Sequence, residues 1–174
     1  MLFNSFEFVL LYFPAVLAGV FLLARLNRTL AASWLGLASV VFYGWWNPRF
    51  VALLLASIAF NYVMGLWISK RRDAGRNVGV VAATTIVADL LVLGYYKYAN
   101  FFIETASAVS GAGLSTLDIV LPLGISFFTF TQIAYIVDTS RGLAREAKPV
   151  HYLLFVTYFP HLIAGPVLHH KQMM

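Results

Sequence analysis

The chain has 174 residues, of which 61% are hydrophobic and only 11% are charged. Soluble domains carry about a quarter charged residues, so this composition excludes an ordinary water-soluble globule. The formal net charge of +5 does not indicate a nucleic-acid partner, because the positive-inside rule produces cationic loops in membrane proteins. The absence of cysteine excludes disulfides, thiolate metal sites and cysteine nucleophiles. The composition therefore predicts an all-α, polytopic transmembrane protein surrounded by lipid.

Six hydrophobic segments follow one another along the chain, each comparable with the ~20 residues that cross a bilayer core. They cover Phe6–Leu26, Leu30–Trp46, Phe50–Ser69, Val78–Tyr96, Ile119–Val137 and Val150–Leu168. The first has neither the basic region nor the cleavage site of a signal peptide, so we expect it to remain as a membrane helix. Tyr98–Gly113 is mixed in polarity, and we expect an interfacial helix or a loop there.

The basic residues are divided unequally when the connections between segments alternate from side to side. Nine of the twelve fall on one side: Arg25, Arg28, Lys70, Arg71, Arg72, Arg76, Arg141, Arg145 and Lys148. The other side receives Arg49, Lys97 and Lys171. The positive-inside rule places the first group in the cytoplasm and the N-terminus outside it.

Two features of the third and fourth segments bear on packing and chemistry. Ser57, Asn61 and Gly65 recur at every fourth residue, a spacing that lines one helix face and lets helices approach closely. Asp89 is the one acidic residue deep in a predicted span. A carboxylate at the bilayer centre costs at least ~2.5 kcal/mol, so Asp89 should have a partner, and Thr85 lies one turn before it. Asp89 is either part of a proton or ion relay or a satisfied packing residue.

The fifth segment, LPLGISFFTFTQIAYIVD, is the most polar of the six. Ser126, Thr129 and Gln132 fall within roughly 120° of arc on a helix that turns about 100° per residue. Beside Pro122 and Gly124, this polar face suits a cavity wall or a broken helix. Interhelical hydrogen bonding without any substrate explains the same residues equally well, and both interpretations stay open.

The four histidines do not have the spacing of a metal site. His151 and His161 are ten residues apart, which means about 15 Å of rise on one helix. His169 and His170 are adjacent and point to different helix faces. None has the i, i+4 pairing or the Cys/His spacing of a zinc site, so we expect no metal.

His161 lies at a point where a helix should break. Pro160 precedes it, and Gly165 and Pro166 follow it. Proline frees a backbone carbonyl one turn earlier, and Gly-Pro ends a helix. His161 therefore either lines a channel or acts as an acid or base, or it satisfies the backbone exposed at the break.

Four motifs together resemble one family. They are SVVFYGWWNPRF, LGYYKYANFF, LPLGISFFTFTQIAYIVDTSRG and YFPHLIAGPVLHH. With them the chain resembles the membrane-bound O-acyltransferase (MBOAT) family, and within it the bacterial branch that contains the alginate O-acetyltransferase membrane subunit. The resemblance extends over essentially all 174 residues. Members of that branch are several hundred residues long, so residues 1–174 resemble the N-terminal part of one larger membrane domain.

The resemblance implies a mechanism for a complete protein of this kind. A funnel and tunnel join a cytoplasmic acyl donor, acetyl-CoA or another acyl thioester, to an acceptor outside. The family's catalytic histidine lies downstream of the matched region, so no residue of this chain takes that role, and the 174 residues alone should be inactive. His161 falls in the FPHLIAGP motif, where glutamine also occurs, which makes it only a weak catalytic candidate. Five residues are candidates for the substrate channel: Asp89, Ser126, Thr129, Gln132 and His161.

The function implied is transfer of an acyl group, expected to be acetyl, to an extracellular or periplasmic polysaccharide such as alginate. The location is the bacterial inner membrane, the partners are periplasmic acetyltransferase proteins and the polymer, and the chain itself binds no cofactor. D-alanyl transfer to teichoic acid and O-acetylation of peptidoglycan are alternatives within the family. The alternatives outside this family are a small transporter or channel subunit, in which Asp89 would be the relay, and a non-catalytic membrane scaffold.

Overall fold

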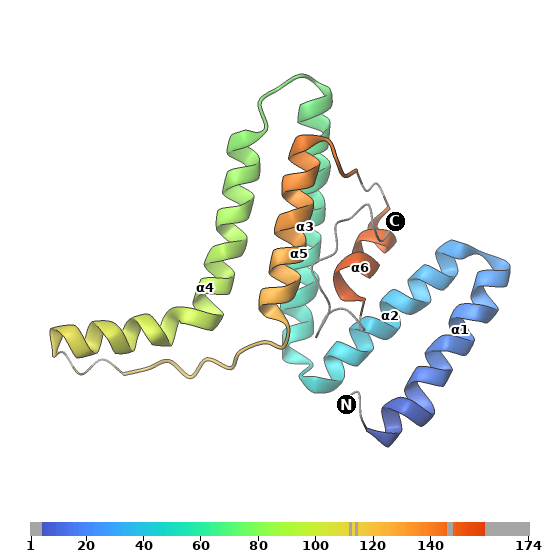
Figure 1. The fold of residues 1–174 in the computed structure, drawn as a ribbon, viewed down its shortest axis with the longest axis horizontal. Coiled ribbons are helices and arrows are strands. Elements are labelled where there is room, and N and C mark those ends of the chain that lie inside the picture. The colour runs from blue at the N-terminus through green and yellow to red at the C-terminus, as the bar shows by residue number, and fades with distance from the viewer. Residues whose placement is uncertain (1–4, 112, 114, 146–147, 159–174) are drawn as a thin grey trace.

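The computed structural model describes residues 5–111, 113, 115–145 and 148–158, and every regular element in them is helical (Figure 1). The chain begins with a short π-helix, η1, over Phe8–Tyr12. The α-helices are α1 (Phe13–Leu26), α2 (Arg28–Trp46), α3 (Arg49–Asp73), α4 (Gly79–Ser110), α5 (Ile125–Arg141) and α6 (Pro149–Thr157). The predicted all-α class is confirmed.

Among the described residues, three helices are long and apolar enough to cross a membrane. They are Phe8–Leu26, Arg49–Asp73 and Gly79–Ser110. Each of the six predicted hydrophobic segments contains a described helix, but α2 and α5, with 19 and 17 residues, are not among these three. α6 ends at Thr157, and residues 159–168 of the sixth predicted segment lie outside the described residues.

The fourth helix continues far beyond the predicted segment. α4 runs through Tyr96 to Ser110 and is capped by Gly111, whose φ of 67° is left-handed. Of the two predictions for residues 98–113, a helix is therefore correct through Ser110. Figure 1 shows that α4 bends, so that its second half runs sideways from the rest of the bundle. Asn100 holds the returning chain against this arm: its side chain accepts from the amide of Leu117 and donates to the carbonyl of Leu117, both at 2.9 Å.

The start of the fifth helix was predicted too early. Residues 119–124 are not helical, and α5 begins at Ile125. Pro122 has no amide hydrogen to donate and disfavours the helical conformation in the residue before it. Gly124 then adopts a φ of 67°, a left-handed conformation that glycine reaches at little cost. These two residues delay the helix by six positions relative to the hydrophobic pattern.

The main core lies where α3, α5 and α6 meet. Its most deeply buried side chains are Tyr43, Leu54, Ile68, Ile125, Phe128, Tyr135, Ile136, Tyr152, Phe155 and Val156. The rings of Tyr135 and Tyr152 pack with their centroids 4.6 Å apart. A smaller cluster, Phe8, Val16, Ala38 and Phe42, joins the N-terminal helices to α2. Aromatic side chains therefore contribute to holding these helices together, including helices too short to be counted as candidate membrane spans.

Connections predicted to share one side of the membrane lie together at one end of the bundle. Arg145 pairs with Asp73 at 3.0 Å, and Arg72 donates a hydrogen bond to the carbonyl of Thr139. At the opposite end of α5, Lys97 donates to the hydroxyl of Ser126 at 3.4 Å. The alternation on which the predicted orientation depends is therefore present from α3 to α5, while the orientation itself stays a prediction.

Gly65 of α3 lies directly against Tyr135 of α5, and it provides a test of this packing. A Cβ at Gly65 would lie 2.5 Å from Cε1 of Tyr135, whose ring is buried against Tyr152. We expect Gly65→Ala to lower the free energy of unfolding by about 1–3 kcal/mol, the usual cost of overpacking, seen as a lower Tm in detergent. Gly94→Ala is the matched control, because a Cβ there meets nothing within 4 Å. Equal melting temperatures for the two variants would contradict the packing.

Candidate functional site

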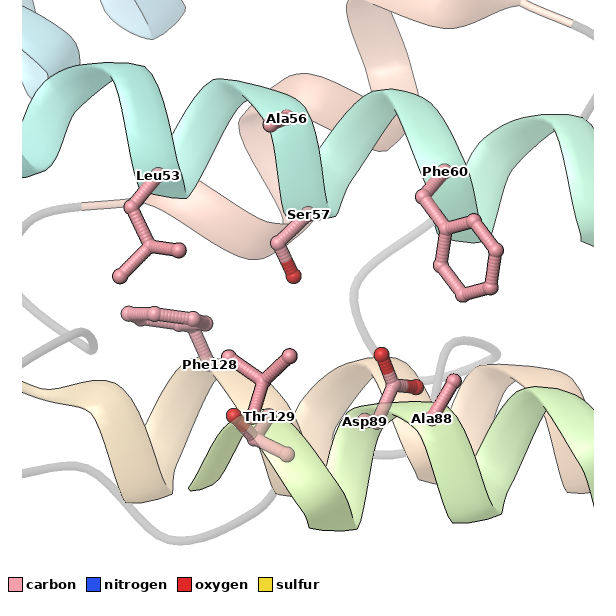
Figure 2. Close-up of a pocket in the computed structure, with 9 residues that line it drawn as sticks. Leu53, Ala56, Ser57, Phe60, Ala88, Asp89, Phe128 and Thr129 are labelled. Carbon is pink, nitrogen blue, oxygen red and sulfur yellow. The ribbon is translucent and has the colours of Figure 1, made fainter. Parts of the chain in front are cut away.

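A cavity of about 280 Å³ lies between α3, α4 and α5 (Figure 2). Its lining consists of Leu53, Ala56, Ser57, Phe60, Ala88, Asp89, Val92, Phe128 and Thr129. Most of this lining is apolar, and its polar groups are the Asp89 carboxyl and the hydroxyls of Ser57 and Thr129. Two of the five predicted channel residues, Asp89 and Thr129, are therefore brought to the same cavity.

The partner of Asp89 is an asparagine of the neighbouring helix. Asp89 is buried, and Nδ2 of Asn61 donates to its Oδ1 at 2.8 Å and to the carbonyl of Ser57 at 3.2 Å. Thr85, which lies one turn before Asp89 and could have donated a hydrogen bond to it, is not its partner. The hydroxyl of Thr85 donates instead to the carbonyl of Val81 at 2.8 Å, because a threonine in a helix readily reaches the carbonyl one turn earlier.

Two acceptor oxygens of this pair are left over. Within the described part of the chain, neither Oδ2 of Asp89 nor Oδ1 of Asn61 has a hydrogen-bond partner, although both are buried. Buried polar atoms in folded proteins are nearly always paired. Figure 2 shows the Asp89 carboxylate pointing from α4 toward α3, with the Ser57 hydroxyl directed into the same space. One carboxyl oxygen of Asp89 and the amide oxygen of Asn61 are therefore buried beside the cavity without a hydrogen bond in the described residues.

Gln132 joins three helices beside the cavity and does not line it. Its Nε2 donates to the hydroxyl of Ser57 at 2.9 Å, and the hydroxyl of Tyr152 donates to its Oε1 at 3.4 Å. Gln132 is fully buried. Of the two interpretations of this helix face, Gln132 forms interhelical hydrogen bonds, whereas Thr129 lines the cavity wall.

The remaining candidates lie elsewhere. Ser126 is at the start of α5, where it contacts Lys97 and not the cavity. His161 lies outside the described residues, as do His169 and His170. His151 is half-buried on α6. In the described ranges, no three His, Cys, Asp or Glu side chains are grouped so that they could hold a metal ion.

Two residues of the site were assigned to another role from the sequence. Ser57 and Asn61 were interpreted as small residues that permit close packing, which holds for Gly65 but understates the other two. Asn61 links Asp89 to α3, and Ser57 links the cavity to Gln132. The available signal was an amide in the middle of an apolar segment, because such a group must find a hydrogen-bond partner.

The site can bind a hydrogen-bond donor. Asp89 and Ser57 both accept hydrogen bonds from amide nitrogens, an arrangement that fixes the two side chains in place. A nucleophile would instead need a base at hydrogen-bond distance, such as an imidazole or an amine. The described geometry supports positioning and recognition, and it assigns no group-transfer step to these residues.

Helices of membrane-spanning length that bury a carboxyl group and an amide beside an apolar cavity define a multi-pass membrane protein. The chain is 34% identical over its full length to the peptidoglycan O-acetyltransferase of Helicobacter pylori. It is also 38% identical over its full length to the probable alginate O-acetylase AlgI of Pseudomonas aeruginosa. It therefore belongs to the membrane-bound O-acyltransferase family of these proteins.

The match has a definite extent. The chain covers 38% of the Helicobacter protein and 34% of the Pseudomonas protein, so it spans about a third of the length of these relatives. A more distant relative is the teichoic acid D-alanyltransferase of Bacillus subtilis, 28% identical over 70% of the chain and covered to 29%. No family model matches the sequence, and no solved structure matches it either.

The hydrogen bond between Asn61 and Asp89 gives a second test. Asn61→Leu removes the donor to Asp89 Oδ1 and leaves a buried acceptor unpaired, which costs about 1–3 kcal/mol. Replacing both partners by leucine should recover part of this loss, because no unpaired carboxyl remains. Thermal unfolding of the two single variants and the double variant in detergent measures the coupling. Additive losses in the double variant would show that the two side chains do not interact.

Proposed function

We propose that this chain is part of a membrane O-acyltransferase that moves an acetyl group from a cytoplasmic donor to an extracellular or periplasmic polysaccharide. The observation that carries the proposal is the identity of 34–38% along the whole chain to proteins named as O-acetylases. The helical fold, with helices of spanning length and polar groups buried between them, supports it. The polymer proposed first is an alginate-type polysaccharide, in line with the 38% identity to alginate O-acetylases.

In this proposal the chain supplies part of the wall of the passage across the membrane. The donor is acetyl-CoA or another acyl thioester, used as a substrate and not as a resident cofactor. Asp89 and Thr129 line a cavity between helices, which supports their role in the passage. Ser126, Gln132 and His161 remain candidates for the same passage, and the group that transfers the acetyl lies outside residues 1–174. Periplasmic acetyltransferase proteins then receive the acetyl group and esterify the polymer.

A second candidate is O-acetylation of peptidoglycan. The 34% identity to the peptidoglycan O-acetyltransferase of Helicobacter pylori over the full chain favours it. Both candidates use the same bond formation, an ester between an acetyl group and a sugar hydroxyl. They differ in the polymer that the outer end of the passage must reach.

Deleting the gene in its own bacterium tests the function. We expect O-acetyl groups to disappear from the exported polysaccharide, measured by hydroxylamine assay or NMR, while those on peptidoglycan remain. Loss confined to peptidoglycan would establish the second candidate. Unchanged acetylation of both polymers would contradict the proposed function.

Complementation of the deletion strain separates the role of this chain from that of the remaining protein. The intact gene should restore acetylation, and residues 1–174 expressed alone should not. Membrane fractions probed with an epitope tag serve as the control that the shorter chain is present. Restored acetylation by the 174 residues would overturn the placement of the transfer step outside them.

The proposed orientation, with the N-terminus outside the cytoplasm, is tested by single cysteines, since the chain has none of its own. Ala74 and Ser115 are exposed and lie in the connections after α3 and after α4. A membrane-impermeant maleimide applied to intact cells should label Ser115→Cys, because that connection is proposed to face outward. Ala74→Cys should react only after the membrane is permeabilised. The reverse pattern would invert the orientation.

A further inference from the structure

A second cavity, of about 250 Å³, lies at the end of the bundle where α3 begins. Three parts of the chain meet at it: the turn between α2 and α3, the middle of α4, and the segment that returns to the bundle after α4 (Figure 1). Its wall combines three polar with three aromatic side chains, namely Asn47, Arg49, Asp118, Phe50, Tyr95 and Tyr96. A wall with apolar surface and a few converging polar groups is typical of a ligand site.

The chain around Asp118 is held in a fixed conformation. Asn100 bonds both the amide and the carbonyl of Leu117 at 2.9 Å. The amide of Ile119 donates to that same carbonyl, also at 2.9 Å, so Asp118 is the central residue of a three-residue turn. Its carboxylate is exposed and forms neither a hydrogen bond nor an ion pair within the described ranges. The turn therefore presents an anionic acceptor at a defined place beside the cavity.

The turn between α2 and α3 supplies hydrogen-bond donors to the same cavity. The Asn47 side chain accepts from the amide of Arg49 at 3.0 Å, which orients Asn47 and leaves its Nδ2 without a partner in the described part of the chain. The Arg49 guanidinium is exposed and pairs there with no carboxylate, Asp118 included. A cation and an anion thus line one cavity without neutralising each other.

The cavity lies at the level of an aromatic belt. Trp45 and Trp46 come just before the turn and are 64% and 42% exposed, and Tyr95 on α4 is 53% exposed. Exposed Trp and Tyr side chains gather where a bilayer has its headgroups. The apolar candidate span of α3 also begins here, at Arg49. The ligands present at this depth are therefore phospholipid headgroups.

An exposed apolar stripe on α4 runs from the cavity into the span. Tyr95, Leu91 and Val87 follow one another at four-residue spacing, so they share a helix face, and they are 53%, 68% and 53% exposed. An acyl chain can lie along this stripe while its headgroup occupies the cavity. A soluble sugar has no part that would use the stripe, so these observations favour a lipid.

We propose that this cavity binds the headgroup of a zwitterionic phospholipid of the phosphatidylethanolamine type. The phosphate accepts hydrogen bonds from the Arg49 guanidinium and from Nδ2 of Asn47, and the ammonium group donates to the Asp118 carboxylate. Phosphatidylglycerol carries the phosphate but no ammonium group, so it satisfies only the donors. The site is separate from acyl transfer, and the proposal holds whichever polymer is acylated.

Native mass spectrometry tests the proposal on the protein expressed from its complete gene, delipidated in detergent and titrated with dioleoyl phosphatidylethanolamine or dioleoyl phosphatidylglycerol. We expect the intact protein to bind phosphatidylethanolamine about tenfold more tightly, the size expected from one hydrogen bond between charged groups. Asp118→Asn should remove this preference by weakening phosphatidylethanolamine alone. Arg49→Gln should weaken both lipids, because both carry the phosphate.

Glu104→Gln is the matched control, since Glu104 is an exposed acid of α4 that does not line the cavity. It should leave both affinities unchanged. Equal affinity of the intact protein for the two lipids would overturn the proposal, and this comparison needs no variant to fold. The proposal also fails if Asp118→Asn has no more effect than Glu104→Gln. Displacement of the lipid by a soluble uronic acid oligosaccharide would assign the cavity to a sugar instead.

Discussion

The hydrogen bond from Asn61 to Asp89 is the interaction on which the polar interior of this chain depends. It joins the middle of α3 to α4, where neither water nor lipid offers a partner to a carboxyl group. Without it, α4 would carry its one buried acidic side chain into an apolar environment. With it, the same amide also donates to the carbonyl of Ser57, so that the position of the cavity and the pairing of the helices have a common cause.

From this bond the polar contacts extend in one direction across the bundle. The hydroxyl of Ser57 accepts a hydrogen bond from Gln132, and Gln132 accepts one from Tyr152. These two hydrogen bonds link α3 to α5 and α5 to α6. The aromatic pair of Tyr135 and Tyr152 covers the same region with apolar surface. A passage for a polar substrate needs such a combination: groups that can hydrogen-bond, fixed by neighbours, inside walls that exclude lipid. The described residues include hydrogen-bonding groups that their neighbours hold in place, and the passage itself stays a proposal.

Hydropathy alone was enough for the class and for most helices, because the lipid environment requires long apolar helical segments. It failed where backbone chemistry overrides hydropathy: residues 119–124 are apolar, yet Pro122 and Gly124 keep them out of α5. It also failed for the partner of Asp89. Thr85 is near Asp89 in the sequence, but the residue that bonds Asp89 is Asn61 of a different helix. A single sequence does not show which residues of two helices come into contact. The position of His161 lies outside the described residues.

The paired hydrogen bonds between Asn100 and Leu117 separate the outer part of α4 from the rest of the bundle. They join the chain at Asn100 to the chain at Leu117, so that the outer part of α4 and the segment after it form a loop closed at these two residues. The described residues between these two, 101–111, 113, 115 and 116, are mostly exposed and contribute little to the bundle. Changes in the length of this segment would therefore leave the start of α5 in place as long as the two hydrogen bonds are kept.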